Sequence, residues 1–372
     1  MQIPLLAEAP RGPAQPATGP GGAEVAHHSV EKHRYGEGGE EYWLYEPAAP
    51  KPDSAPVIIF THGWTATNPA PYGAWIDHLV KRGAIVIYPR YQADLRTPAS
   101  EFTPNTIAAL KAAFERLKTE PGHVTPRWDQ CAVVGHSVGG LLAANIAALA
   151  AESGLPPMRA VMSVEPGKTR TFAPKFSVEL TDLSKLPAET LLLAVAGDSD
   201  TVVGDVDAKR VYDESTKVPA ANKNYITLIS DNHGEPPLNA SHFAPVAPDL
   251  TYSNGEWKPT LNRGEDGAGG SGPLREKIKE RIAERRAAAE GGVGTPANSN
   301  PPVEQSEAAA NGLAAFSVDA LDYYGLWKLF DGLADAAFFG KNRQSALGDT
   351  PEQRFMGRWS DGVPVKELKV GR

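Results

Sequence analysis

Residues 131–134 form an apolar run, Cys-Ala-Val-Val, that leads into Gly-His-Ser-Val-Gly-Gly at residues 135–140. An Ala- and Leu-rich segment with helical composition follows at residues 141–152. A buried strand, a sharp Gly-x-Ser-x-Gly turn and a helix, in this order, form the pattern of a nucleophile elbow. The flanking glycines let strand and helix pack closely, and the helix N-terminus directs free N–H groups toward negative charge beside the serine. The pattern therefore predicts that Ser137 is a nucleophile rather than part of a structural turn.

Short apolar segments alternate with segments of helical periodicity over most of the chain. We expect strands at residues 41–46, 57–60, 84–88, 131–134, 160–164, 191–196 and 225–229, and helices at residues 72–82, 103–118, 141–152 and 206–215. Repeated strand–helix units predict an α/β fold with a doubly wound, mostly parallel sheet flanked by helices on both faces.

Composition limits the classes of function. The 372 residues carry a formal net charge of −8, so the basic surface typical of nucleic-acid binding is not indicated. No apolar run approaches the length of a membrane span. The single cysteine, Cys131, lies in the apolar strand before the elbow, so we expect a core residue and no internal disulfide.

Composition also suggests four parts. Residues 1–35 are rich in Pro, Ala and Gly and are expected to form a flexible leader. Residues 36–253 form the predicted core, residues 254–311 a low-complexity mobile insertion, and residues 312–372 a C-terminal helix and tail that pack on the core. On the hypothesis that the leader remains from a signal peptide replaced by a start methionine, we expect a secreted or periplasmic location over a cytoplasmic one.

A nucleophilic serine requires a histidine base and a carboxylate that orients the histidine. Among the acids, Asp200 follows the strand at residues 191–196 and lies farther into its loop than Asp198, which is expected to bond the turn backbone. We therefore favour Asp200, with Asp205 as a third choice. Glu165, after the strand at residues 160–164, is topologically possible as the acid, but we expect it to cap its loop instead.

Two histidines are candidates for the base, and the sequence leaves both open. His233 follows the strand at residues 225–229 closely, and this position favours it slightly. His242 lies nine residues later, in the string Ala-Ser-His-Phe-Ala-Pro. The histidine that is not the base is expected to order the surrounding loop. His136, next to the nucleophile, is expected to pack and to form hydrogen bonds, since neighbouring side chains point apart.

An oxyanion hole requires two N–H groups that converge on the reacting carbonyl oxygen. We expect one from Val138, the residue after the nucleophile, and the other from Trp64, in the His-Gly-Trp string after residues 57–60. Gly63 would permit the tight turn there. No segment has the spacing of a metal site or of a Gly-rich phosphate loop, so we expect no metal and no cofactor.

These motifs resemble those of the α/β-hydrolase superfamily. The resemblance covers residues 42–248 and the helix near residues 316–339. The segment around His242 and the Gly-His-Ser elbow look like those of bacterial cutinases and polyester hydrolases, whereas His233-Gly234 looks like the histidine string of dienelactone-hydrolase-like members. Cutinases are shorter, lack residues 254–311, usually carry a disulfide and have Tyr or Phe where this chain has Trp64.

The resemblance implies a serine carboxylester hydrolase that acts on a small-molecule or polymeric ester through a Ser-His-Asp triad and an acyl-enzyme. An amidase, thioesterase or acyltransferase on the same fold is the alternative, because a fold does not fix the substrate. A non-catalytic binding module is the remote alternative.

Overall fold

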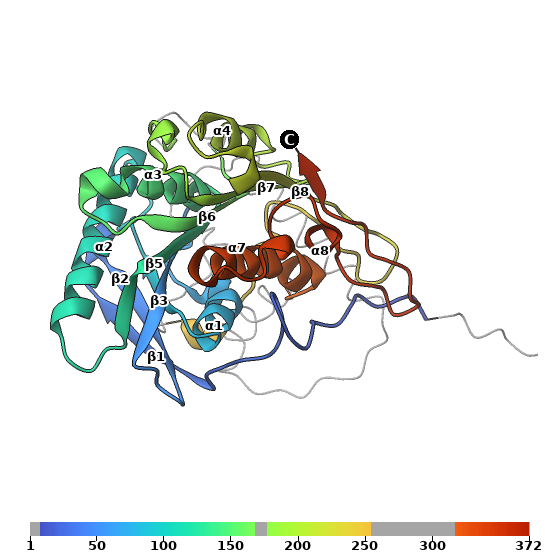
Figure 1. Cartoon of the computed structure of the whole chain (residues 1–372), viewed down its shortest axis with the longest axis horizontal. Helices are drawn as coiled ribbons and strands as arrows, with labels where there is room; N and C mark the ends of the chain where they lie inside the picture. The colour runs from blue at the N-terminus through green and yellow to red at the C-terminus, as the bar shows by residue number, and fades with distance from the viewer. Residues whose placement is uncertain (1–7, 168–176, 254–316, 372) are drawn as a thin grey trace, which may run out of the picture.

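The computed structural model describes residues 8–167, 177–253 and 317–371. In this part of the chain, nine strands form one twisted sheet in the order β1-β2-β4-β3-β5-β6-β7-β8-β9 (Figure 1). The strands are β1 (Ser29–Tyr35), β2 (Tyr42–Ala48), β3 (Ser54–Thr61), β4 (Ile85–Pro89), β5 (Thr125–His136), β6 (Met158–Val164), β7 (Leu191–Gly197), β8 (Lys223–Leu228) and β9 (Lys369–Gly371).

The sheet is parallel from β4 to β8 and antiparallel at both edges. Every strand predicted from the apolar pattern is present, and the prediction of a mostly parallel, doubly wound α/β fold is confirmed. The carboxyl ends of parallel strands meet at one edge of a sheet, where the loops of open α/β folds build their sites.

Helices cover both faces. They are α1 (Gly73–Lys81), α2 (Phe102–Thr119), α3 (Val138–Ser153), α4 (Val206–Glu214), α7 (Trp327–Phe339) and the short α8 (Pro351–Arg354). Side chains of β3 alternate between two cores: Phe60 packs with α1 and α7, and Ile59 packs with α2, α3 and α4. This period-2 burial with apolar residues on both sides is expected of a central strand covered on both faces.

The described part of the N-terminal segment corrects one prediction. Residues 29–35, which composition assigned to a flexible leader, form β1 and pair with β2 along their whole length. Upstream, the N–H of Gly21 donates to Asp331 at 2.7 Å, and the hydroxyl of Tyr323 donates to the carbonyl of Pro13 at 2.6 Å. Composition did not reveal these two upstream contacts because the partners of Gly21 and Pro13 lie 310 residues away along the chain.

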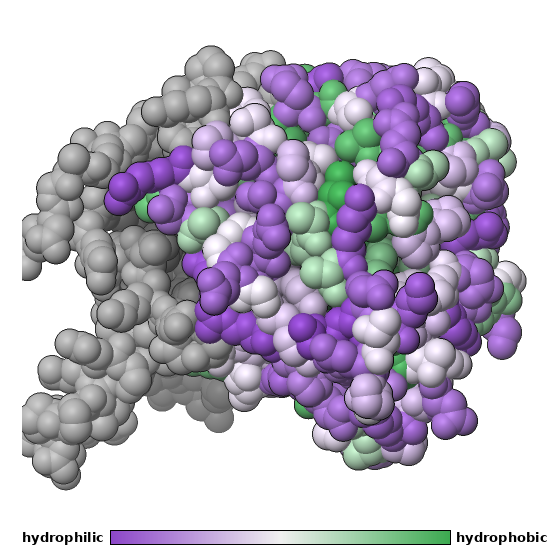
Figure 2. Space-filling view, turned by 90° about the vertical axis from the view of Figure 1, so that its left-hand side faces the viewer, coloured by the Kyte–Doolittle hydropathy of each residue, from purple (hydrophilic) through white to green (hydrophobic). Residues whose placement is uncertain are grey.

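Side chains of the C-terminal segment belong to one of the two buried cores. A π-helical turn (Leu321–Leu326) precedes α7, which covers the centre of one sheet face, and the last described residues add the edge strand β9 (Figure 1). The predicted insertion at residues 254–311 lies outside the described residues. Among the described helices, none combines the length and the apolar character needed to span a membrane. The face drawn in Figure 2 is largely hydrophilic, with a patch of apolar residues near its centre.

Candidate active site

Ser137 occupies the sharp turn between β5 and α3. Its backbone has φ 57° and ψ −125°, a strained conformation for a residue with a side chain. The turn is held by the Ser137 N–H, which donates to the carbonyl of Val164 at the end of β6, at 2.9 Å. The geometry is that of a nucleophile elbow, in which strain presents the serine oxygen above the sheet.

Two glycines make the elbow sterically feasible. A Cβ atom on Gly135 would lie 2.1 Å from the carbonyl oxygen of Gly139, and one on Gly139 would lie 2.2 Å from the carbonyl oxygen of Thr61. A Cβ atom does not come this close to a non-bonded backbone oxygen in folded proteins, so both positions require glycine. The missing side chains let α3 start directly against β3, which carries the His-Gly-Trp loop.

The structure brings Ser137, His242 and Asp200 into one hydrogen-bonded row. Nε2 of His242 lies 2.9 Å from Oγ of Ser137, and its Nδ1 lies 2.8 Å from Oδ2 of Asp200. The three residues are only 4%, 5% and 8% exposed, respectively. The contact with a carboxylate fixes Nδ1 as the protonated nitrogen, so Nε2 is free to accept the proton of the serine hydroxyl.

Asp200 is held in its loop after β7 by backbone donors. Its Oδ1 accepts the N–H groups of Val202 at 2.8 Å and Val203 at 3.0 Å, which leaves Oδ2 for His242. Burial acts to raise the pKa of Asp200, but the hydrogen bonds and the charge of His242 outweigh it and lower the pKa below its ordinary value. The other two candidate aspartates face elsewhere: Asp198 accepts the N–H of Ser230, and Asp205 pairs with Lys209.

The preference for His233 as the base is not met by the geometry. Its Nε2 lies 2.8 Å from Oδ2 of Asp361 in the C-terminal tail, and 36% of its side chain is exposed. Its ring lies 5.8 Å from that of Trp359. His233 therefore orders the contact between its loop and the tail, and the structure places His242 beside the serine instead.

The path of the chain after β8 explains why the histidine nearer to this strand in the sequence is not the one that lies beside Ser137. Asp231 and Leu238 form an antiparallel bridge, so residues 232–237 leave the sheet edge and return. Asp231 also fixes this excursion to the tail, since it accepts the indole N–H of Trp359 and the N–H of Lys366. After this return, the carbonyl of Ala240 accepts the N–H of Ser199, the neighbour of Asp200. This contact places His242 beside Ser137 and Asp200.

The His-Gly-Trp loop lies against the elbow. A Cβ on Gly63 would lie 3.4 Å from Cβ of Ser137, so the loop backbone runs beside this serine. The N–H of Gly63 donates to the hydroxyl of Tyr72 at 3.0 Å, and His62 stacks on Tyr91 at a centroid distance of 4.0 Å. Val138 is the first residue of α3, where backbone N–H groups lack acceptors within the helix.

His136 and Glu165 form a second buried layer. The hydroxyl of Tyr72 donates to Nδ1 of His136 at 2.7 Å, and Nε2 of His136 donates to the carbonyl of His242 at 2.8 Å. Burial, with the charge of His242, lowers the pKa of His136 to about 3, so its ring is neutral. His136 thus supports the backbone of His242, in agreement with the hydrogen-bonding role predicted for it.

Glu165 was predicted to cap its loop, yet its carboxyl group faces the triad. Its Oε2 lies 3.5 Å from Nε2 of His136 and 3.9 Å from Nδ1 of His242, and the residue is fully buried. Burial, reinforced by the charge of Asp200, raises its pKa well above the ordinary value. Potential metal-ligand atoms of Glu165 and the two histidines lie within 4.8 Å of one another, but hydrogen bonds already engage all four ring nitrogens.

A cavity of about 240 Å³ lies elsewhere, between the ends of α1 and α7 and the first residues of β3. It is lined among others by Leu79, Arg82 and Phe338, and it shares no residue with the triad. This cavity therefore does not define the substrate side of Ser137.

Comparison with known proteins agrees with the topology. A family model described as alpha/beta hydrolase fold matches residues 58–199. The matched segment contains Gly63, Trp64, Ser137 and Val138 and ends one residue before Asp200. No curated protein matches the chain. The family match and the nine-stranded sheet with its flanking helices together establish the α/β-hydrolase fold and support a hydrolase.

Proposed function

We propose that the protein is a serine carboxylester hydrolase with Ser137 as nucleophile, His242 as general base and Asp200 as the orienting acid. The observation that carries the proposal is the buried hydrogen-bonded row of these three side chains, at 2.9 Å and 2.8 Å. Nucleophile, acid and base follow one another along the chain in the order usual for this fold. The role of each residue is argued from this geometry.

In the acylation step, Oγ of Ser137 attacks the ester carbonyl carbon while its proton moves to Nε2 of His242. The backbone N–H groups of Val138 and Trp64 are the proposed donors to the oxyanion of the tetrahedral intermediate. When the intermediate collapses, the ester C–O bond breaks and the imidazolium returns the proton to the departing alcohol. The acyl group then remains on Ser137.

In the deacylation step, a water molecule gives one proton to His242 and attacks the acyl carbon. Collapse of the second tetrahedral intermediate returns that proton to Oγ of Ser137 and releases the carboxylic acid. Asp200 stays ionised throughout and stabilises the imidazolium. The lowered pKa of Asp200 supports this role, because its carboxylate remains charged below the pH at which an ordinary aspartate is half protonated.

The choice of an ester rests on the resemblance of the elbow and of the His242 segment to those of bacterial cutinases and polyester hydrolases. An amide, a thioester or acyl transfer to a second acceptor would use the same three side chains. Turnover of matched ester, amide and thioester substrates by the same preparation separates these reactions.

The decisive experiment measures hydrolysis of p-nitrophenyl esters of increasing acyl length by the wild type, Ser137→Ala, His242→Ala and His233→Ala. We expect the first two variants to lose about 10⁶-fold in kcat, since removal of a serine or histidine of such a triad disables the whole unit. His233→Ala is the matched control, since its ring bonds to Asp361 in the tail. It should keep the wild-type kcat within a few-fold.

Labelling with a fluorophosphonate probe separates inactivity from the wrong choice of substrate. If the wild type reacts with the probe at Ser137 but cleaves no ester, the triad assignment holds and the ester assignment fails. If the probe does not react, or if Ser137→Ala retains full esterase activity, the proposed mechanism is refuted.

A further inference from the structure

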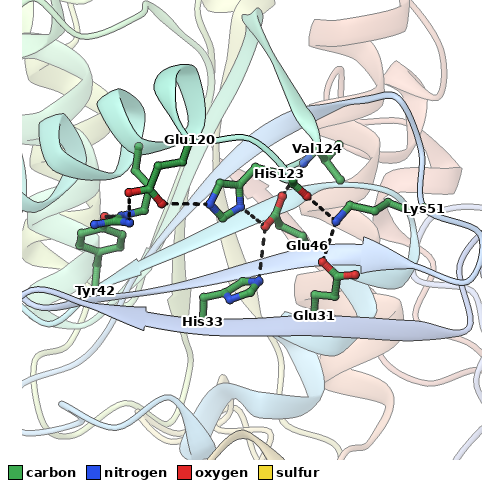
Figure 3. Close-up of polar contacts among 10 residues, drawn as sticks. Glu31, His33, Tyr42, Glu46, Lys51, Glu120, His123 and Val124 are labelled. Carbon is green, nitrogen blue, oxygen red and sulfur yellow. Dashed lines mark hydrogen bonds and ion pairs between the residues drawn. The ribbon is translucent and has the colours of Figure 1, made fainter.

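Two histidines and a glutamate meet at the edge of the sheet formed by β1 and β2. His33 lies on β1, Glu46 on β2, and His123 in the loop before β5 (Figure 3). One potential metal-ligand atom from each residue lies within 4.8 Å of the corresponding atoms of the other two. None of the three belongs to the triad or to the layer that supports it. Residues 33, 46 and 123 are far apart in the sequence, which is why no ligand spacing indicated a metal.

The strand register explains how His33 and Glu46 come together. Glu31 of β1 pairs directly with Glu46 of β2. Because side chains two residues apart on a strand project from the same face, His33 shares the face of Glu31 and Glu46. His123 approaches this face from the loop that joins α2 to β5. The cluster therefore depends on the pairing of β1, which composition did not predict.

Glu46 is the centre of the cluster and is fully buried. The N–H of Val124 donates to its Oε1 at 2.7 Å, which fixes the orientation of the carboxylate. The other oxygen, Oε2, lies 2.6 Å from Nδ1 of His123 and 3.7 Å from Nε2 of His33 (Figure 3). One carboxylate oxygen thus faces two imidazole nitrogens. Ligands about 2.1 Å from a tetrahedral zinc ion lie about 3.4 Å apart, so only small side-chain movements are needed for coordination.

The surroundings resemble those of a metal ligand as well. Nε2 of His123 lies 3.8 Å from Oε2 of Glu120, so a second carboxylate lies near the ring nitrogen that faces away from Glu46, where a hydrogen-bonded carboxylate commonly orients a metal-bound histidine. The side chain of His123 is 9% exposed, whereas that of His33 is 36% exposed. Water and an ion can therefore reach the cluster from the side of His33. Lys51 pairs with Glu31 and the carbonyl of Gly122, so its cation is not directed at Glu46.

We infer that His33, Glu46 and His123 bind a divalent transition-metal ion, with water completing the coordination. Two imidazoles and one carboxylate form a nitrogen and oxygen donor set that suits zinc. The ion would link β1, β2 and the loop before β5, three segments that only the folded chain brings together. Because an ion that binds the folded state alone stabilises it by mass action, zinc should raise the temperature of unfolding.

The test uses the full chain, stripped of metal with a chelator and titrated with zinc chloride by calorimetry. We expect one equivalent of zinc to bind to the wild type and to His242→Ala, in which the buried cluster at the triad is incomplete. His33→Ala and His123→Ala should each lose at least about 100-fold in affinity, since loss of an outer-shell partner alone costs about 10- to 100-fold. His28→Ala, which removes an exposed histidine next to β1, is the matched control and should bind zinc as the wild type does.

Two further measurements test the site without the variant His123→Ala, in case that variant does not fold. X-ray absorption of the zinc-loaded wild type should show two imidazole nitrogens and a carboxylate oxygen, and zinc should raise its unfolding temperature but not that of His33→Ala. Absence of zinc binding by the folded wild type refutes the inference. So does wild-type affinity in His33→Ala, or loss of binding in His242→Ala alone, which would place the ion at the triad. Esterase activity should be unchanged in His33→Ala, so failure of this site and failure of the proposed function are separable.

Discussion

Oε2 of Glu165 lies 3.9 Å from Nδ1 of His242, the same nitrogen that Oδ2 of Asp200 approaches at 2.8 Å. The ring of His242 therefore faces two carboxyl groups, one after β6 and one after β7. Their environments separate them: Asp200 has a lowered pKa and accepts backbone N–H groups, whereas both oxygens of the buried Glu165 lack a hydrogen-bond partner among the described residues. The opposite directions of the two pKa shifts favour a protonated Glu165 beside an ionised Asp200.

Replacement of Glu165 by glutamine should therefore leave kcat/KM within a few-fold of the wild type, since a neutral acid is exchanged for a neutral amide of similar shape. The folded-state pKa of Glu165 is raised, so the folded protein holds this proton more tightly than the unfolded chain. Stability from this group is then complete below the pKa of the unfolded chain and is lost as pH rises toward the folded pKa. Urea unfolding at several pH values above 4 should show a smaller decline for Glu165→Gln than for the wild type. A loss of activity of several orders of magnitude would mean that Glu165 is the charged acid.

Asp200→Asn should lower kcat by about 10⁴-fold, because an amide holds the histidine in the wrong tautomer. Asp198→Asn is the matched control in the same loop, since Asp198 bonds Ser230 and not the histidine. Steady-state kinetics on one activated ester compare the two variants, with circular dichroism to confirm the fold. Similar losses in both variants would point to a general disturbance of the loop rather than to the orienting role of Asp200.

Gly139→Ala should disable the elbow. The added Cβ would lie 2.2 Å from the carbonyl oxygen of Thr61 and 2.3 Å from that of His62, and neither backbone atom can move without displacing β3 or its loop. We expect a loss of about 1–3 kcal/mol in the free energy of unfolding, as for other overpacked sites, together with loss of activity. Gly12→Ala is the control, because the nearest atom to its Cβ would lie 4.0 Å away. Unaltered activity in Gly139→Ala would contradict the close packing of α3 against β3.

Tyr72→Phe tests the support of the His-Gly-Trp loop. The hydroxyl accepts the N–H of Gly63 and donates to Nδ1 of His136, so its removal leaves two buried polar groups without a partner. Each such group costs about 1–3 kcal/mol, and displacement of the loop should also lower kcat. Tyr45→Phe is the matched control, since the buried hydroxyl of Tyr45 has no hydrogen-bond partner among the described residues. Chemical denaturation and ester kinetics of both variants check this, and equal stability in the two would show that the hydroxyl of Tyr72 supports nothing.

The local pattern of apolar residues was sufficient to predict the framework of the fold. The strands that it predicted are apolar runs buried on both faces, where nearly every side chain contacts a helix and the pattern is strong. The edge strands β1 and β9 were not predicted. β1 is largely polar and half exposed, and β9 has only three residues. β9 in addition pairs with β8, which lies far earlier in the chain, so the sequence next to β9 does not indicate this pairing.

The sequence by itself determined the elbow, since the glycines at 135 and 139 and the serine between them act within a few residues of one another. It also placed an acid and two histidines on loops at the correct edge of the sheet. Only the tertiary structure shows which of those histidines lies beside the serine. The bridge of Asp231 to Leu238 and the contacts of Asp231 with the tail carry His233 away and return His242 to Ser137. The same holds for the cluster of His33, Glu46 and His123, which exists only where two strands and a distant loop meet. The hydrogen bonds of Asp231 with the tail join residues 128 and 135 positions apart, and that of Glu46 with His123 joins residues 77 positions apart. Contacts at such separations leave no periodic trace in the local sequence.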